Sequence, residues 1–594
     1  MTNLIPFIPT LAAAGETTTA SAWLLPLMVL IPLLSALAIA LFIPADRPAT
    51  VRAVALWSSV LGFALAMLML VRFDWSNAGA FQFASYTPWM EGLGIGFRFG
   101  ADAVSVWLIV LAALLLPLTI LGTWHDIKHR VKEYFVWLLV LQTALVGVFS
   151  AMDLILFYVF FEMTLIPLFF LIGIFGSGNR IFAATKFFVF TLAGSIFTLV
   201  AVLYVAYFHA GLTGEWTFSI PQLVAVSGQM SPVEQGWVLM GLLIGFSVKV
   251  PLFPVHTWLP LAHTEAPTAG SVILAGVLLK LGSYGLLRFA LPMAPEAIVT
   301  FAPYIAIFAI IAILYAALIC WVQTDMKKLV AYSSVSHMGF CVLGLVALNA
   351  AGVGGSIIYM INHGLATGAL FLCVGMIYSR FHTRELAAYS GLGKRLPIWS
   401  FFFVFFCLAS VGLPGLNGFV GEFLTILGAF TATDVLGIPF AIFATLGVIL
   451  AAIYILYMVN KVVFGPVGVP TEEQGAEPNP QDLNTREIAT LAPLAVLCLV
   501  LGLYPTPMLQ SFEPTIDNIT AAAQQVIAER NPDETEAPAV TEQPADPLQT
   551  TIPAAAEPRA QLHDAEAPIP LASRSSLHAT TAAHALRVGE EESR

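Results

Sequence analysis

Six ionisable residues lie inside apolar segments that have the roughly 20-residue length of a membrane-spanning helix. A charged side chain at mid-membrane depth costs at least about 2.5–3.5 kcal/mol on insertion scales, so it is seldom there without a use. Carboxylate, ammonium and imidazole groups can all take up and release protons, and chains of such groups serve as proton relays in membranes. We therefore predict a midplane polar axis made of Glu162, Lys249, Lys280, His337, His363 and Glu422.

Two of these residues lie beside sequence that should break a helix. Pro251 and Pro254 follow Lys249 and remove backbone hydrogen-bond donors, while the stretch GLPGLNG precedes Glu422. Non-helical backbone at membrane depth is tolerated only inside protein or along a wet cavity. A broken helix next to a buried charge is typical of an ion path. Lys249 and Lys280 each lie roughly 12 residues from the ends of their segments, or about 18 Å, which is too far for their side chains to reach an interface.

The composition is that of an integral membrane protein, because 58% of the 594 residues are hydrophobic and only 10% are charged. The five cysteines all fall in apolar runs without a CxxC pair, which argues against a zinc or iron–sulfur site. Nucleotide-binding glycine loops are absent from the sequence. A central lysine would repel a resident Na⁺, and no dense set of oxygen ligands appears. We therefore expect a chain that moves protons, has no cofactor of its own and binds no nucleic acid.

The predicted fold class is an all-α polytopic membrane protein. Residues 73–102 are polar and aromatic and should lie on one membrane surface as a hairpin. The pattern of apolar runs predicts about 14 transmembrane helices, at 23–43, 51–71, 103–123, 134–150, 153–175, 181–208, 236–261, 268–290, 301–321, 327–347, 353–379, 397–429, 438–463 and 488–505.

The seventh and twelfth of these helices should both be broken, which suggests an internal duplication. If helices 4–8 and 9–13 are two five-helix units, the odd number forces opposite orientations, so the two units form an inverted repeat. The predicted regions are N-terminal helices 1–3 with the surface loop (1–133), a first repeat (134–290), a second repeat (291–463), the last transmembrane helix (464–511) and a tail (512–594).

The tail differs in kind from the rest, because Ala, Pro, Glu and Thr dominate it and aromatic residues almost vanish. Such a composition predicts an acidic disordered segment with at most short helices near 519–530 and 577–588. Truncation after about residue 511 is therefore expected to leave assembly largely intact.

Basic residues are unevenly distributed between the loops on the two sides of the predicted helices. The excess marks the cytoplasmic side, so both termini should face the periplasm of a bacterial inner membrane. Loops after even-numbered helices carry only Arg72, Arg98 and Arg288. Loops after odd-numbered helices carry Arg47, Arg52, Lys128, Arg130, Lys132, Arg180, Lys327, Lys328, Arg380, Arg384, Lys394, Arg395, Lys461 and Arg486.

Three stretches carry a specific resemblance: KVPLFPVHTWLPLAHTEAPTAGSVILAGVLLKLGSYGLLR, DMKKLVAYSSVSHMGF and GLPGLNGFVGEFL. Together they resemble the antiporter-like subunit M (chain 4) family of proton-pumping NADH:quinone oxidoreductase, respiratory complex I, over about residues 20–510. The long tail is a departure from that family. The resemblance implies a fourteen-helix inverted repeat and a proton-translocating function driven by redox chemistry in other subunits.

The resemblance also implies roles for the six residues. Glu162 and Lys249 would form the input pair of a proton channel, Lys280 the central relay, and Glu422 the terminal residue, with His337 and His363 continuing the axis. The implied partners are the lipid bilayer, protons and other membrane subunits, especially neighbouring antiporter-like ones. NADH and quinone would be bound by other subunits of the complex.

Two other transport functions share parts of this pattern. A subunit of a multi-subunit Na⁺/H⁺ antiporter would share the lysine-bearing helices and the first glutamate, and a membrane subunit of an energy-coupling hydrogenase is a further alternative. The local contexts TEAPTAGSV and GLPGLNGFVGEFL favour the oxidoreductase. A structural scaffold without an ion path is disfavoured, because buried charges are costly.

Overall fold

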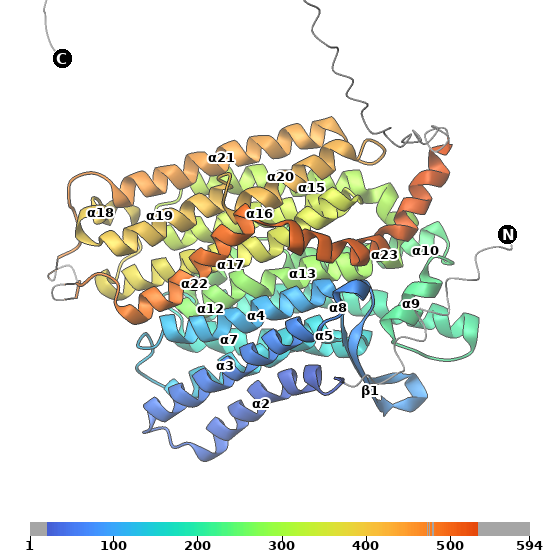
Figure 1. Cartoon of the computed structure of the whole chain (residues 1–594), viewed down its shortest axis with the longest axis horizontal. Helices are drawn as coiled ribbons and strands as arrows, with labels where there is room; N and C mark the ends of the chain where they lie inside the picture. Colours follow the sequence, from blue (N-terminus) through green and yellow to red (C-terminus); the bar gives the residue numbers. More distant parts are fainter. Residues whose placement is uncertain (1–20, 472, 474–475, 478–479, 533–594) are drawn as a thin grey trace, which may run out of the picture. The chain divides into compact units, whose positions relative to one another are not determined.

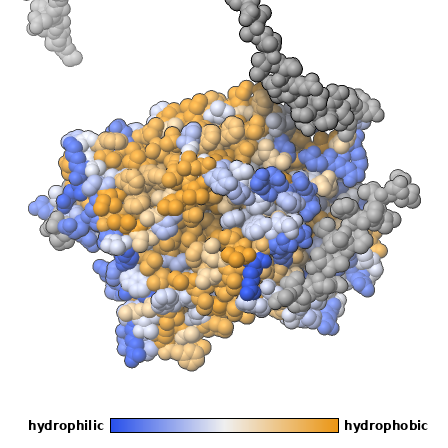
Figure 2. Space-filling view, viewed as in Figure 1, coloured by the Kyte–Doolittle hydropathy of each residue, from blue (hydrophilic) through white to orange (hydrophobic). Residues whose placement is uncertain are grey.

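The computed structural model describes residues 21–471, 473, 476–477 and 480–532, and this part of the chain is mainly helical (Figure 1). Figure 2 shows hydrophobic residues across the middle of one face and hydrophilic ones gathered toward the two ends of the helices. Twelve of the described helices are long and apolar enough to cross a membrane, which confirms the predicted class. They are α2 (Leu24–Phe42), α3 (Pro48–Arg72), α4 (Ala103–Gly122), α5 (Val131–Ser150), α6 with α7 (Leu154–Phe175), α8 (Arg180–Thr213), α12 to α14 (Thr268–Met293), α15 (Pro295–Trp321), α16 (Met326–Val346), α17 (Ala350–Phe381), α21 (Ile438–Val463) and α22 (Thr485–Leu503).

The other two predicted spans are broken helices, as expected. The seventh comprises α10 (Pro232–Lys249) and α11 (Leu259–Glu265), and the twelfth comprises α19 (Pro397–Val411) and α20 (Asn417–Thr431). Neither belongs to the twelve, so the total of fourteen spans stays a prediction. Gly412 ends α19 with φ +79°, and a Cβ there would lie 2.2 Å from a carboxylate oxygen of Glu422. Glycine is therefore needed both for the turn and for the close approach of Glu422.

Two further irregularities, which the sequence analysis did not predict, lie next to site residues. The helix over 153–175 is divided into α6 (Leu154–Met163) and α7 (Leu165–Phe175) by a turn at Thr164. The eighth spanning helix contains two π-helical turns, η3 (Leu274–Leu278) and η4 (Leu286–Ala290). These turns flank the segment α13 (Leu279–Gly285), which carries Lys280. The eighth spanning helix begins with α12 (Thr268–Ile273) and ends with α14 (Leu291–Met293). Such π-turns within α-helices are frequent at functional sites.

The predicted surface hairpin is present as two antiparallel strands, β1 (Gln82–Met90) and β2 (Ile95–Ala101). Short 3₁₀ turns, η1 (Trp75–Asn77) and η2 (Glu91–Leu93), precede β1 and join the strands. Arg98 of β2 pairs at 2.9 Å with Asp153, which caps α6. Asp102, which follows β2 and caps α4, pairs at 2.7 Å with Arg288 of η4. The hairpin is thus tied to the two spanning helices that carry Glu162 and Lys280.

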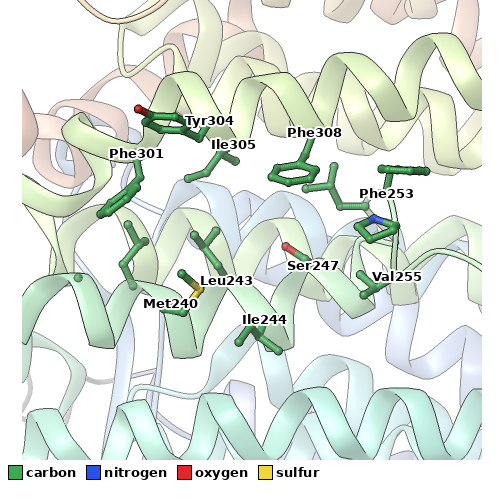
Figure 3. A pocket seen from close by; sticks show the side chains of 14 residues that line it. Met240, Leu243, Ile244, Ser247, Phe253, Val255, Phe301, Tyr304, Ile305 and Phe308 are labelled. Carbon is green, nitrogen blue, oxygen red and sulfur yellow. The ribbon is translucent and has the colours of Figure 1, made fainter.

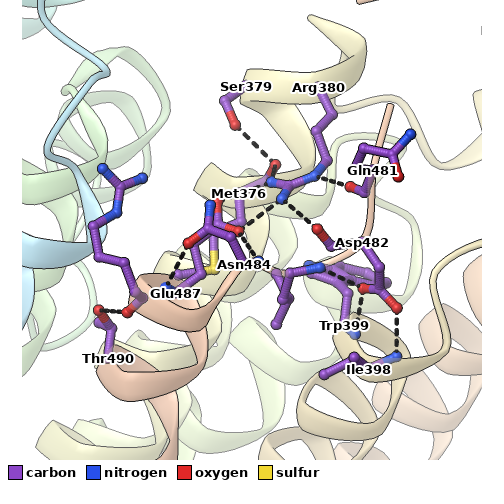
Figure 4. Close-up of polar contacts among 12 residues, drawn as sticks. Met376, Ser379, Arg380, Ile398, Trp399, Gln481, Asp482, Asn484, Glu487 and Thr490 are labelled. Atoms are coloured by element: carbon purple, nitrogen blue, oxygen red, sulfur yellow. Dashed lines mark hydrogen bonds and ion pairs between the residues drawn. The ribbon is translucent and has the colours of Figure 1, made fainter. Parts of the chain in front are cut away.

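At the other end of the helices, one buried arginine joins three elements (Figure 4). Arg380, near the end of α17, pairs at 2.7 Å with Glu487 of α22 and donates at 2.7 Å to the carbonyl of Gln481. The Asp482 carboxylate accepts hydrogen bonds from the first backbone N–H groups of α19. Residues 480–484 therefore hold α17, α19 and α22 together. The remaining short elements are α9 (Ile220–Ser227), η5 (Leu386–Ala388) and α18 (Leu392–Arg395).

The prediction of a disordered segment from residue 512 is wrong for residues 512–518, and the short helix expected near 519–530 is part of a longer one. These residues belong to α23 (Thr506–Arg530), a single 25-residue helix that packs on α4, α14, α15 and α17. Its buried residues include Phe512, Ile516 and Ile519, which recur at helical spacing on one face. The composition of the whole tail hid this short amphipathic pattern. The second predicted helix, 577–588, lies outside the described residues.

The expected effect of truncation changes accordingly. Removing all residues after 511 should lower the thermal stability of the protein, because it deletes the buried face of α23 and the hydrogen bond from Thr515 to the Ala78 carbonyl. Phe512→Ala alone should cost about 3–5 kcal/mol, the usual range for a buried phenylalanine. Melting curves of the detergent-solubilised protein measure the loss. Glu513→Gln, at an exposed position of the same helix, is the control, and equal melting curves for all variants would contradict this prediction.

Candidate functional site

The structure places five of the six predicted site residues in the interior and leaves Glu162 half-buried. Lys280 is 0% exposed, and Lys249, His337, His363 and Glu422 are at most 3% exposed. A buried ionisable group is costly unless other polar groups contact it. The partners of each side chain therefore show what the site can do.

Lys280 and His363 are in direct contact. The Lys280 Nζ lies 2.7 Å from Nδ1 of His363, and it also donates to the carbonyl of Ala275 in the adjoining π-turn. When Lys280 is an ammonium group it can only donate, so Nδ1 of His363 then accepts and a neutral imidazole carries its proton on Nε2. This contact joins α13 to α17, which lie 83 residues apart in sequence at this point.

His337 and Glu422 are joined through a tyrosine that the sequence analysis missed. The Tyr359 hydroxyl lies 2.5 Å from Nδ1 of His337 and donates at 2.6 Å to Oε1 of Glu422. The direct distance from His337 Nδ1 to Glu422 Oε1 is 3.6 Å. Tyr359 precedes His363 by four residues, so the two share a face of α17. That spacing is the signal that could have found Tyr359 from the sequence.

A small cavity separates the Lys280–His363 contact from the His337 group. It has a volume of about 10 Å³, and the rings of His337 and His363 lie 5.5 Å apart at its edge. One water molecule needs roughly 10–15 Å³. The cavity lining includes Asn362, Ser410 and Thr367, and Ser410 Oγ lies 3.2 Å from Nε2 of His337. The space therefore has both the size and the polar partners that a bridging water requires.

Glu162 and Lys249, the implied input pair, have no direct ion pair in this structure. The Lys249 Nζ donates at 3.1 Å to the Thr164 hydroxyl and lies 4.7 Å from the ring centre of Phe161. In the described part of the chain, no ion pair within 4.0 Å joins Lys249 to Glu162, and Oε1 of Glu162 is buried without a hydrogen-bond partner. Thr164 is a second contact residue that the sequence analysis missed. It occupies the turn between α6 and α7.

Comparison with known proteins shows which family this chain belongs to. A family model described as "NADH:quinone oxidoreductase/Mrp antiporter, TM" matches residues 151–449. NADH-quinone oxidoreductase subunit M of Rhodobacter capsulatus is 44% identical over 511 residues, covering 84% of this chain and 96% of the relative. This chain belongs to the subunit M (chain 4) family of NADH:quinone oxidoreductases. A further relative is NADH-ubiquinone oxidoreductase chain 4 of Marchantia polymorpha, 41% identical, covering 83% of this chain and 96% of that one.

Two solved structures contain chains with this fold. A chain of respiratory complex I from Thermus thermophilus matches with a TM-score of 0.74 and 32% identity, covering 84% of this chain and 99% of that one. A chain of the Mrp complex from Dietzia sp. matches with a TM-score of 0.72 and 21% identity, covering 86% of this chain and 100% of that one. The second likeness shows a shared fold alone.

The two halves of the site in this subunit M family member meet through close backbone packing. A Cβ on Gly282 of α13 would lie 2.7 Å from the backbone N of Val250, one residue after Lys249. A Cβ on Gly285 would lie 2.3 Å from the Phe246 ring of α10. Within the described residues, no hydrogen bond connects the Lys249 group to Lys280. The helices are therefore adjacent, while a polar link between the two lysines is missing in this state.

A polar cavity of about 460 Å³ reaches the start of the spanning helix that carries Lys280. Its lining includes Asp126, Glu265, Thr268, Lys327 and Arg384. Desolvation of its carboxyl group within the cavity raises the pKa of Asp126, in the loop between α4 and α5, to about 6, against the lowering effect of a hydrogen bond to Thr268. Lys327 donates to the carbonyl of Ala266, between α11 and α12. We call this space the vestibule.

An apolar groove of about 270 Å³ lies between α10 and α15, beside the break in the seventh span (Figure 3). Figure 3 shows side chains of both helices pointing into it, with Ser247 as a polar group among aliphatic and aromatic ones. Met240 and Phe301 at its rim are 48% and 40% exposed. Neither the lysines nor the histidines of the site line this groove, so it is separate from the polar axis.

Proposed function

We propose that this chain carries protons across the membrane as a subunit of an NADH:quinone oxidoreductase, driven by redox chemistry in other subunits. The observation that carries the proposal is the sequence of contacts from Lys280 to His363, and from His337 through Tyr359 to Glu422. Each member can hold or pass a proton, and all are buried.

The proposed path has an input and an output. The vestibule, with its mixture of acidic and basic groups, supplies protons from the side where Lys327 lies. Glu162 controls the charge on Lys249, and Lys249 in turn acts electrostatically on Lys280 across the close contact of α10 and α13. From Lys280 the proton passes to His363, crosses the small cavity through one water molecule, and reaches His337. Glu422 releases it on the other side.

The chain itself needs no redox cofactor in this scheme. NADH and quinone bind to other subunits, and neighbouring antiporter-like subunits and lipid surround this one in the inner membrane of a bacterium. A chain of the Mrp complex shares the fold, so the fold by itself does not separate the oxidoreductase from the antiporter alternative. The relatives named subunit M or chain 4 at 38–44% identity favour the oxidoreductase.

The proposed orientation places both termini in the periplasm and Lys327 with Lys328 on the cytoplasmic side. Single cysteines at Lys328 and Glu513, introduced after the native cysteines are replaced, should react with a membrane-impermeant maleimide from opposite sides of sealed vesicles. We expect the cysteine at 513 to react from the periplasmic side alone. Labelling of that cysteine from the cytoplasmic side alone would reverse the orientation.

Glu422→Gln tests the proposed path directly. The change keeps the shape of the side chain and removes its titration, so NADH-driven proton pumping should fall several-fold. Pumping into inverted membrane vesicles, divided by the content of assembled complex, measures the effect. Wild-type pumping with full assembly would remove Glu422 from the path.

A further inference from the structure

We propose that Tyr359 is a proton-relay residue whose hydroxyl passes the proton from His337 to Glu422. This inference rests on the proposed function and adds a member to the path. It is carried by two short contacts of one buried hydroxyl: 2.5 Å to Nδ1 of His337 and 2.6 Å to Oε1 of Glu422.

The two contacts have a defined direction. A phenol hydroxyl has one hydrogen, and here it is donated to the carboxylate of Glu422. The phenol oxygen must therefore accept at its other contact, so Nδ1 of His337 carries a hydrogen and donates it to Tyr359. Nε2 of His337 faces the Ser410 hydroxyl and the small cavity. The hydrogen bonds thus run in a single direction from His337 to Glu422.

The direct route is too long to replace this bridge. His337 Nδ1 and Glu422 Oε1 are 3.6 Å apart, beyond the usual range of a hydrogen bond. The Tyr359 ring is also held firmly in place. It lies edge-on to His337 and to Phe340, and a Cβ added to Gly421 of α20 would lie 2.5 Å from the Cβ of Tyr359. Packing this close keeps the hydroxyl between its two partners.

The transfer balances in protons and charge. His337 begins as an imidazolium, protonated on both nitrogens, and Glu422 as a carboxylate. The Nδ1–H bond breaks as an O–H bond forms on the Tyr359 oxygen, while the original O–H bond breaks and its proton binds Oε1 of Glu422. The products are neutral His337 with its hydrogen on Nε2, an intact phenol and a carboxylic acid. Neither a phenolate nor a redox change is needed.

The same geometry delays the next transfer. After the step, the Tyr359 hydrogen points to Nδ1 of His337 and the Glu422 acid donates to the phenol oxygen. The hydroxyl can turn back only when Glu422 has lost its proton and is again an acceptor. A second proton therefore waits until the first has left, which favours movement in one direction.

Tyr359→Phe in the complete complex is the test, because it keeps the ring and removes the hydroxyl. We expect NADH-driven proton pumping to fall about tenfold relative to the content of assembled complex. Tyr454→Phe is the matched control, since Tyr454 is a fully buried tyrosine whose hydroxyl has no hydrogen-bond partner among the described residues. That control should pump as the wild type does. Glu422→Gln is measured in the same vesicles.

The outcomes separate this inference from the proposed function. Wild-type pumping by Tyr359→Phe together with loss in Glu422→Gln would overturn the tyrosine relay and leave the path standing. Wild-type pumping by both variants would overturn the relay and the role of Glu422. An equal loss in Tyr454→Phe would overturn the relay by showing a general effect of removing buried hydroxyls.

A second variant keeps the test decisive if the phenylalanine complex does not assemble. Fluorotyrosine at position 359 preserves the size and the hydroxyl but makes that hydroxyl more acidic. A relay residue should then show an altered pH profile of pumping at full assembly. An unchanged profile would overturn the relay.

Discussion

Lys280→Ala should abolish NADH-driven proton pumping while the complex still assembles. Lys280 is the member of the path that contacts His363, at 2.7 Å, and alanine removes both the proton and its donor. Lys280→Arg should not restore pumping, because a guanidinium does not release its proton at any pH that the protein survives. We expect pumping by both variants at or below about a tenth of the wild-type value, because proton transfer along the path stops when one relay member is lost.

The measurement compares the rate of proton pumping with NADH oxidation and with subunit content in the same inverted vesicles. Lys461→Ala, at an exposed position near the end of α21, is the control for loss of a lysine. The competing interpretation is that Lys280 only packs and pairs inside the protein. Under that interpretation, proton pumping falls only as far as the amount of assembled complex falls. Full pumping by Lys280→Arg would establish it.

Lys249→Ala should have an effect of similar size, through a different cause. In this structure Lys249 donates to Thr164 and not to Glu162, so the postulated control by Glu162 needs one of the two side chains to move. An ion pair and a separated pair differ in how strongly Lys249 holds its proton, and each pKa unit is worth about 1.36 kcal/mol. Removing Lys249 deletes this control, and coupled turnover should be lost or strongly reduced.

The substitutions around Lys249 separate control from packing. Lys249→Arg should rescue only partly, and Glu162→Asp should be milder than Glu162→Gln because it retains a carboxylate. Thr164→Val removes the acceptor at 3.1 Å without changing a charge, so its effect should be smaller than that of Lys249→Ala. Pumping per assembled complex is the readout. Full activity of Lys249→Arg would show that Lys249 is a structural cation and does not control proton transfer by changing its charge.

Much of the site could be predicted from the sequence because its signals are local. An ionisable residue within a long apolar run can be recognised as a candidate site residue from its neighbours in sequence alone, because that run places it inside the membrane, where a charge is costly. The breaks beside Lys249 and Glu422 also follow from nearby residues: Pro251 and Pro254 in one, and Gly412 with its positive φ in the other. Spanning helices and the surface hairpin follow from the same short-range patterns.

Contacts between distant segments were decided only by the tertiary structure. Tyr359 joins α16 to α20, and its role depends on how those helices pack against α17, which no local period encodes. The choice of Thr164 over Glu162 as partner of Lys249 depends likewise on the turn between α6 and α7 and on the approach of α10. The helix α23 forms because a ready-made surface of four spanning helices buries Phe512 and its neighbours. Apolar runs determined which residues are buried. Packing between helices determined which of them touch, because these side-chain contacts join residues that lie far apart in the sequence.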